Sequence, residues 1–364
     1  MIRTVQSLLA NALVRVHLGR DWRKPSDPAL TSHYAAYVQI LTWFLDTPAG
    51  EAPFSVHRIS LAGKGQGKPI GQWFGPSEAA GALKALVNAY PLAGIGIATA
   101  VDGLVHQPDV YAASHANPLE TGSSKISQAW GNRPVLVLIE VRPGVDSVNP
   151  IYYDNLKALF TFPQSVGIAG ARKMFIARGR PRDSYYFVAS QADKLFYLDP
   201  SILKSSILLR PLQNTARDEK NDTAEVDGGR DCGVEALKVR RIVQEVPPEQ
   251  YEEQPTQSAG SSGSHHQFDP RKLEESMLDS AQLHYCTAYT TAELQTFHCD
   301  SFREIPLSGL DPSMLIGFLC KNEEEWMDLK RRVAELPGFI CILQDERPSD
   351  RELSLQDEPT RVLD

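Results

Sequence analysis

Apolar residues recur at helical spacing through the first third of the chain. Between residues 1 and 18 they are Leu8, Leu9, Ala12, Leu13 and Val16. Intervals of three and four place these side chains on one face, which predicts an amphipathic helix. The same reasoning predicts helices over about 34–45 and over 76–89, where proline takes the favoured first position. The N-terminal part is therefore expected to be mostly helical.

The middle of the chain changes to short apolar runs rich in β-branched and aromatic residues. These runs, bounded by Gly, Pro, Asp and Asn, cover 94–101, 135–141, 185–189 and 195–198. Such runs predict strands of one sheet. A helix is expected at about 151–160, and the chain should end with a strand at 314–320, a charged helix at 323–336 and a strand at 339–343. The fold class predicted by this order is α/β or α+β.

Residues 213–264 break the pattern, because they are rich in Asp, Glu, Lys, Gln, Pro, Ser and Gly. Too few apolar side chains are present to offset the entropy of ordering, so this stretch is expected to be largely disordered. The polar residues 344–364 are expected to form a flexible tail.

Composition excludes several classes of protein. The chain has 364 residues and 42% hydrophobic content, enough for a substantial core. A formal charge of -8 argues against nucleic acid as a partner. The longest apolar runs, 135–141 and 314–320, are far shorter than the roughly 20 residues that span a bilayer. The five cysteines are odd in number and lie late in the chain, which favours a reducing cytoplasm over a disulfide framework.

Three local motifs contain residue types found in phosphate-binding, zinc-binding or catalytic sites, and the residues alone do not decide whether any of them has that role. The glycines and lysines of 63–68 are reminiscent of a phosphate loop, but the spacing is wrong and Pro69 follows. His284, Cys286, His298 and Cys299 are zinc-type ligands at a spacing that matches no common site, so we expect neither a metal nor a cofactor. Asp199 ends a predicted strand before Pro200, where it is either a turn residue or a carboxylate presented to a cleft.

Several segments together carry a resemblance that covers most of the chain. They are MIRTVQSLLANAL (1–13), HLGRDW (17–22), GQWFGPS (71–77), RPVLVL (133–138), PQSVGIAG (163–170), YYF (185–187), YLDP (197–200) and LDPSMLIGF (310–318). In this order they resemble the fungal-type autophagins, cysteine proteases that process the ubiquitin-like modifier of autophagy. The resemblance implies a papain-like fold with a helical N-terminal part and a central, mostly antiparallel sheet. It further implies one protease domain formed by 1–200 and 265–343, with a disordered insert at 201–264 and a flexible tail at 344–364.

The resemblance also implies a Cys-His-Asp triad, in which a thiolate attacks, an imidazole moves the proton and a carboxylate orients the imidazole. In the family the cysteine ends a Gly-Trp-Gly-Cys segment, so it is expected just before Met1, and the chain as given lacks it. Asp199 matches the family's aspartate. Ser201 stands where the family has histidine, and removing 201–264 would bring His265 directly after Pro200, so His265 is the expected base.

The implied activity is cleavage at the modifier's C-terminus and release of its phosphatidylethanolamine conjugate. The tail of the modifier is expected to bind near Trp73 and a gate-like loop that contains Pro163, Gln164, Gly167 and Gly170. The modifier and its lipid conjugate are the expected partners, with membrane contact only through the substrate, in the cytoplasm, the nucleus and the pre-autophagosomal structure. Without its cysteine the chain is expected to be inactive, and the alternative is a non-catalytic modifier-binding protein. Trp73 could equally be a core or helix-entry aromatic residue.

Overall fold

The computed structural model describes residues 1–116, 129–172, 184–202, 204–212, 278–299, 301–336 and 338–344. The chain divides into two compact units. Unit 1 is formed by Met1–Ala12, Arg58–Ile202 and Asp300–Asp364, and unit 2 by Leu13–His57 and Leu203–Cys299.

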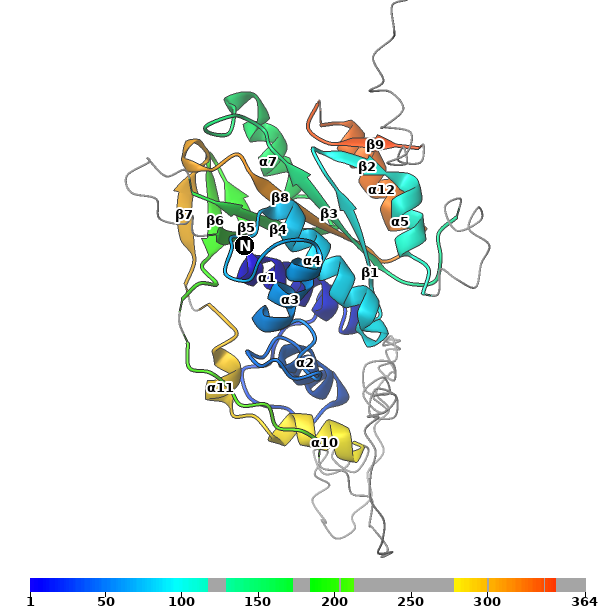
Figure 1. The fold of residues 1–364 in the computed structure, drawn as a ribbon, viewed down its shortest axis with the longest axis vertical. Coiled ribbons are helices and arrows are strands. Elements are labelled where there is room, and N and C mark those ends of the chain that lie inside the picture. Colours follow the sequence, from blue (N-terminus) through cyan, green and yellow to red (C-terminus); the bar gives the residue numbers. More distant parts are fainter. Residues whose placement is uncertain are drawn as a thin grey trace, which may run out of the picture. The chain divides into compact units, whose positions relative to one another are not determined.

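Unit 1 is built on a seven-stranded sheet with the order β1-β3-β8-β4-β5-β6-β7 among the described residues (Figure 1). The strands are β1 Gly96–Ala100, β3 Val135–Val141, β4 Ser165–Ala171, β5 Ser184–Gln191, β6 Lys194–Leu198, β7 Arg303–Pro306 and β8 Met314–Cys320. β1 pairs with β3 in parallel, and the remaining neighbours in this order pair antiparallel. The predicted mixed fold with a mostly antiparallel sheet is thus confirmed. A small second sheet joins β2 Leu104–His106 to β9 Cys341–Leu343.

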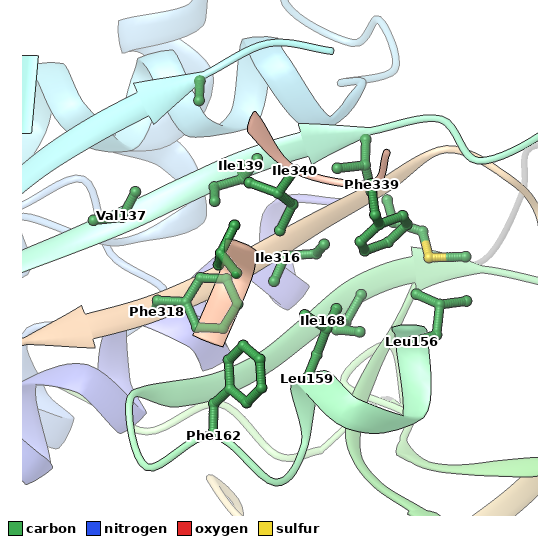
Figure 2. Packing of buried hydrophobic residues seen from close by; sticks show 14 of the residues in the cluster. Val137, Ile139, Leu156, Leu159, Phe162, Ile168, Ile316, Phe318, Phe339 and Ile340 are labelled. Atoms are coloured by element: carbon green, nitrogen blue, oxygen red, sulfur yellow. The ribbon is translucent and has the colours of Figure 1, made fainter. Parts of the chain in front are cut away.

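One face of the large sheet is covered by helices that follow or interrupt the strands. These helices are α5 Gln107–Ala113, α7 Tyr153–Leu159 and α12 Glu323–Ala334. Alternate strand residues such as Val137, Ile139 and Ile316 meet Leu156 and Leu159 of α7 in a buried cluster (Figure 2). Each fully buried aliphatic side chain of this kind contributes about 1.5–3 kcal/mol.

The other face of the sheet receives helices from the N-terminal part. α1 Ile2–His17 begins in unit 1, followed by α3 Val56–Gly65 and α4 Pro76–Ala89. Leu8 of α1 lies against β8 at Gly317, where a Cβ atom would be 3.0 Å from Leu8 Cδ2. α4 contacts β1, β3 and β8. A glycine in the middle of β8 therefore lets α1 approach the sheet closely.

Unit 2 contains the C-terminal turn of α1, α2 Ser32–Thr42, α10 Ser280–Thr287 and α11 Thr291–Gln295. Side chains of α2 and α10, including Tyr34, Tyr37 and Tyr285, form its buried cluster. Thr31, Asp279 and Thr290 cap the three helix starts by accepting backbone N–H donors, and the last two complete capping boxes. Polar caps thus fix where these short helices begin.

The structure corrects one prediction about chain organisation. The stretch 163–170, expected to be a flexible gate-like loop, is mostly strand β4, which lies between β8 and β5. Its glycines allow close packing inside the sheet, and the apolar residues between them, Val166 and Ile168, are buried. The predicted loop is therefore wrong from Ser165 onward.

The predicted division into domain, insert and tail stays a prediction. Of the expected insert at 201–264 the structure describes only 201–202 and 204–212, and of the expected tail only residue 344. Ile207 and Leu212 pack against the apolar cluster of unit 2. No helix within the described ranges has the length and apolar character needed to cross a membrane.

Candidate active site

Asp199 directly follows β6, and its carboxylate is held by two neighbours. Ser201 donates to Asp199 Oδ1 from its backbone N at 3.0 Å and from its hydroxyl at 2.5 Å. Arg303 of β7, which pairs with Tyr197, places a guanidinium nitrogen 3.8 Å from Oδ2. The Asp199 side chain is only 13% exposed. Asp199 therefore opens a turn at the end of β6, and its presentation to a cleft stays a prediction.

The first turn of α1 is the helix start that the predicted nucleophile would precede. Thr4 N and Val5 N donate to Met1 O at 3.0 and 3.1 Å. Backbone N–H groups at a helix start, with the helix dipole, favour negative charge and lower the pKa of a nearby thiol. The position directly before Met1 is at this end. Thr4 is fully buried, and its hydroxyl has no hydrogen-bond partner within the described part of the chain.

A buried tyrosine joins α1 to the central strands. Asn11 Nδ2 donates to the Tyr186 hydroxyl at 3.0 Å, and this hydroxyl donates to the backbone oxygen of Val166. Tyr186 on β5 is paired with Leu198 on β6, the residue before Asp199. The side chain of Tyr186 therefore links α1 to the part of the sheet where β6 ends and Asp199 follows.

Trp73 lies in the connection between α3 and α4, and its side chain is 59% exposed. Ile70 in the same connection is 61% exposed. The connection is anchored at its base by buried Phe74, which occupies the space beside Gly63, and by the Lys68–Glu78 ion pair at 3.0 Å. Trp73 is thus not a core residue, and the core interpretation is excluded.

The predicted substrate residues around β4 are mostly interior. Pro163 is exposed, whereas Gln164 is 2% exposed and donates its amide to Glu325 O at 3.1 Å and to Asp328 Oδ2 at 2.9 Å on α12. Gly167 has φ +119°, and a Cβ there would be 2.7 Å from Phe187 O. A Cβ at Gly170 would be 3.2 Å from the Phe187 ring. Their role in substrate binding stays a prediction.

The structure brings the candidate residues together only in part. Pro163, Gln164, Gly167 and Gly170 lie just before and along β4, while Asp199 is two strands away at the end of β6. Trp73 comes from a separate connection. His265 lies outside the described residues.

Two of the four described cysteines are too buried to act as nucleophiles. Cys286 and Cys320 are buried. Burial raises the pKa of the Cys286 thiol to about 11, the opposite of what thiolate chemistry needs. Cys286 donates to Thr31 O, and His284 and His298 contact Arg210 O and the Tyr37 hydroxyl. No cluster of three potential ligands suited to a metal ion is found in the described ranges.

Comparison with known proteins decides the family. A model of the Peptidase C54 catalytic domain matches residues 1–332. The chain belongs to the peptidase C54 family. The match includes α1, the whole seven-stranded sheet and Asp199.

Fungal relatives of this peptidase C54 chain are named as cysteine proteases. It is 40% identical to "Cysteine protease ATG4" of Cryptococcus neoformans, over 97% of the chain and 37% of the relative. It is 31% identical to "Probable cysteine protease ATG4" of Pichia angusta, over 92% and 48%. A third relative, "Probable cysteine protease atg4" of Aspergillus niger, is 30% identical over 98% and 65%. The chain thus spans about one third to two thirds of the length of these curated relatives. The fungal-type autophagin identification is confirmed.

Three residues that contact Asp199 or link α1 to the sheet, Asn11, Tyr186 and Arg303, were not predicted from the sequence as parts of the candidate site. Asn11 and Tyr186 are 175 positions apart, so no local pattern links them. Arg303 stands in a polar segment with no strand pattern. The one available signal was Tyr186 within the strand predicted at 185–189, because a buried tyrosine hydroxyl needs a hydrogen-bond partner.

Proposed function

We propose that this chain is the catalytic part of a thiol endopeptidase of autophagy. It cleaves after the C-terminal glycine of the ubiquitin-like modifier and hydrolyses the bond to phosphatidylethanolamine in the lipid conjugate. The observation that carries the proposal is Asp199 at the end of β6, in the same unit as the start of α1 and within the family match over 1–332. Membership of one unit supports the proposal, because a helix-borne thiolate and a strand-borne carboxylate must act on one histidine.

The proposed chemistry needs no cofactor. A thiolate directly before Met1 attacks the scissile carbonyl, and the imidazolium of His265 donates its proton to the leaving amine. Water then attacks the thioester and loses a proton to the now neutral imidazole, which releases the carboxylic acid and regenerates the thiolate and the imidazolium. Asp199 orients the imidazole through its carboxylate.

The exposed connection between α3 and α4 supports a role in substrate binding. Trp73 and Ile70 present apolar surface on an anchored base, which suits the extended tail of a protein substrate. The exposure of Pro163 supports direct contact with the substrate, and we propose that Gln164, Gly167 and Gly170 act by shaping β4. The partners are the modifier and its lipid conjugate. Membrane contact occurs through the substrate, and we place the protein in the cytoplasm, the nucleus and the pre-autophagosomal structure.

A second candidate is a non-catalytic protein that binds the modifier. It is favoured by the contacts of Asp199, whose carboxylate is engaged by Ser201 and Arg303. We propose that cleavage requires a cysteine at the start of α1, whereas binding of the modifier does not.

The deciding experiment compares cleavage of the modifier by three proteins. They are residues 1–364, the same chain preceded by Gly-Trp-Gly-Cys, and that extended chain with 201–264 removed. An Asp199→Asn version of each extended protein and a serine in place of the added cysteine serve as controls. Cleavage by an extended protein, lost in both controls, supports the protease. If all three proteins bind the modifier and none cleaves it, the binding protein replaces it.

A further inference from the structure

The hydroxyl of Tyr186 is the junction between α1 and the sheet. Tyr185 and Phe187 belong to the buried cluster on the face of α7 and α12. Alternation along β5 therefore turns Tyr186 to the opposite face, where α1 lies. There it accepts a hydrogen bond from Asn11 at 3.0 Å and donates one to Val166 O. One buried side chain thus uses its hydroxyl in both directions.

The backbone of β4 is shaped to receive this tyrosine. In the pairing with β8, Ser165 opposes Phe318 and Gly167 opposes Gly317, so Val166 is an extra residue at an irregularity. At this bulge its carbonyl accepts the hydrogen bond from the Tyr186 hydroxyl. A Cβ on Gly167 would be 2.7 Å from the Tyr186 ring, which explains why glycine stands there. The bulge supplies the acceptor for the Tyr186 hydroxyl, and the glycine leaves space for the Tyr186 ring.

Apolar contacts alone leave a helix some freedom to slide and rotate on a sheet, because hydrophobic burial is not directional. Leu8 and Leu9 supply such contacts on α1. A hydrogen bond from Asn11 is directional, so it fixes the rotation and the axial position of the helix. Asn11 is about 15 Å along the helix from Met1. A shift at Asn11 is carried along the rigid helix to its first turn.

We propose that Asn11 and Tyr186 are positioning residues that set the first turn of α1 relative to Asp199. Tyr186 is paired with Leu198, so it sits beside the strand end from which Asp199 projects. The inference rests on the proposed function, in which the reacting thiol directly precedes Met1. Neither residue touches the reacting atoms.

The test uses the full chain preceded by Gly-Trp-Gly-Cys. Tyr186→Phe removes the hydroxyl, Asn11→Leu removes the amide at similar size, and Tyr185→Phe is the matched control on the opposite face. For each protein, peptide-resolved mass spectrometry follows alkylation of the added cysteine by iodoacetamide between pH 5 and 10. Thermal unfolding and the kcat and KM of modifier cleavage are measured on the same samples.

The expected result is an altered pH profile of alkylation in Tyr186→Phe and Asn11→Leu, and a fall in kcat of roughly 10- to 100-fold with KM unchanged. Tyr185→Phe should match the parent in both. If Tyr186→Phe folds and alkylates with the parent's pH profile, the positioning role is overturned. The parent could fail to cleave the modifier while the pH profile of alkylation still shifts in Tyr186→Phe and Asn11→Leu. That result would support the positioning role and overturn the proposed protease function.

Discussion

A single buried amide connects the start of β4 to α12. Gln164 donates to Asp328 Oδ2 and Glu325 O, and Asp328 is also bonded by Arg331 and Arg332. Hydrogen bonds from Arg332, Gln164 and Arg331 hold the pKa of the Asp328 carboxyl well below its usual range. The amide is therefore part of a charged network that stabilises the fold.

Gln164→Ala should lower the free energy of unfolding by about 1–3 kcal/mol, because it removes two hydrogen bonds to α12, one of them to the charged Asp328 carboxylate. Urea unfolding measures this, and Gln72→Ala at an exposed position is the control. An unchanged unfolding midpoint combined with weaker modifier binding would instead give Gln164 the predicted substrate role.

Gly167→Ala should be more harmful than Gly170→Ala. Gly167 combines φ +119° with a virtual Cβ 2.7 Å from backbone Phe187 O, whereas the Cβ at Gly170 meets only side-chain carbon atoms, the nearest at 3.2 Å. A non-glycine residue at such a φ costs of order 1–3 kcal/mol before the clash is added. Thermal unfolding of both variants checks the order, and equal melting temperatures would contradict it.

At the level of single residues, the sequence predicted which side chains to consider as candidates better than it predicted which side chains contact one another. Asp199 and Trp73 could be selected because each stands in a recognisable segment. The bond between Asn11 and Tyr186 could not, because it depends on how α1 lies on the sheet. Gln164 was assigned to substrate because a polar residue between Pro163 and a glycine-containing stretch gives no sign of burial.

Among the elements, continuous apolar runs were the most informative. β3 and β8 have the predicted bounds, and α4 does too, since proline marks its start. α3 was missed because its glycines have low helix propensity, and β7 because it is short, charged and ends in Pro306. The glycines of β4 were interpreted as flexible, although in a sheet they permit close approach.

An ion pair adds to the apolar contacts between residues 204–212 and the helices of unit 2. Arg210 makes two hydrogen bonds to Glu293, at 3.0 and 2.5 Å, and lies over the Tyr289 ring. Hydrogen bonds from Arg210, then from Thr290, lower the pKa of Glu293 to about 2. A carboxylate whose pKa is lowered on folding stabilises the protein above its unfolded pKa of about 4.3 and loses that contribution as the pH falls towards 2.

Glu293→Gln should therefore be less stable than the parent by about 1 kcal/mol at pH 7, and the two should converge near pH 2. Hydrogen exchange of α10 and α11 between pH 7 and pH 2 follows this difference. Glu304→Gln, which loses the more exposed pair with Lys194, is the control. A difference in stability between the parent and Glu293→Gln that stays constant with pH would contradict the stabilising role of the ionised Glu293 carboxylate.

For the whole molecule, the boundary of the insert can be tested by stability. Ile207, Arg210 and Leu212 contact unit 2, and Leu278 packs on the same apolar cluster. The two flanks of 213–277 thus lie on one cluster. A deletion that begins at 201 removes contacts that one beginning at 213 retains.

Replacing 213–277 by roughly ten Gly and Ser residues should raise the free energy of unfolding by about 1.5 kcal/mol, because a shorter loop costs less entropy to close. Removing 201–264 should lower it, since the contacts of Arg210 are lost. Urea denaturation of both proteins beside the parent gives the comparison. Equal stability of the 201–264 deletion and the parent would show that 204–212 adds nothing to unit 2.

The exposed indole of Trp73 gives the molecule an internal optical reporter. Of the five tryptophans, Trp43 and Trp326 are fully shielded and Trp22 and Trp130 are half-buried, whereas Trp73 is 59% exposed and is therefore the one most open to quenching by iodide. Any molecule that covers the connection between α3 and α4 therefore shifts the red edge of the spectrum and protects part of the signal. Occupancy of this surface can be followed in the unlabelled protein, whether or not a bond is cut.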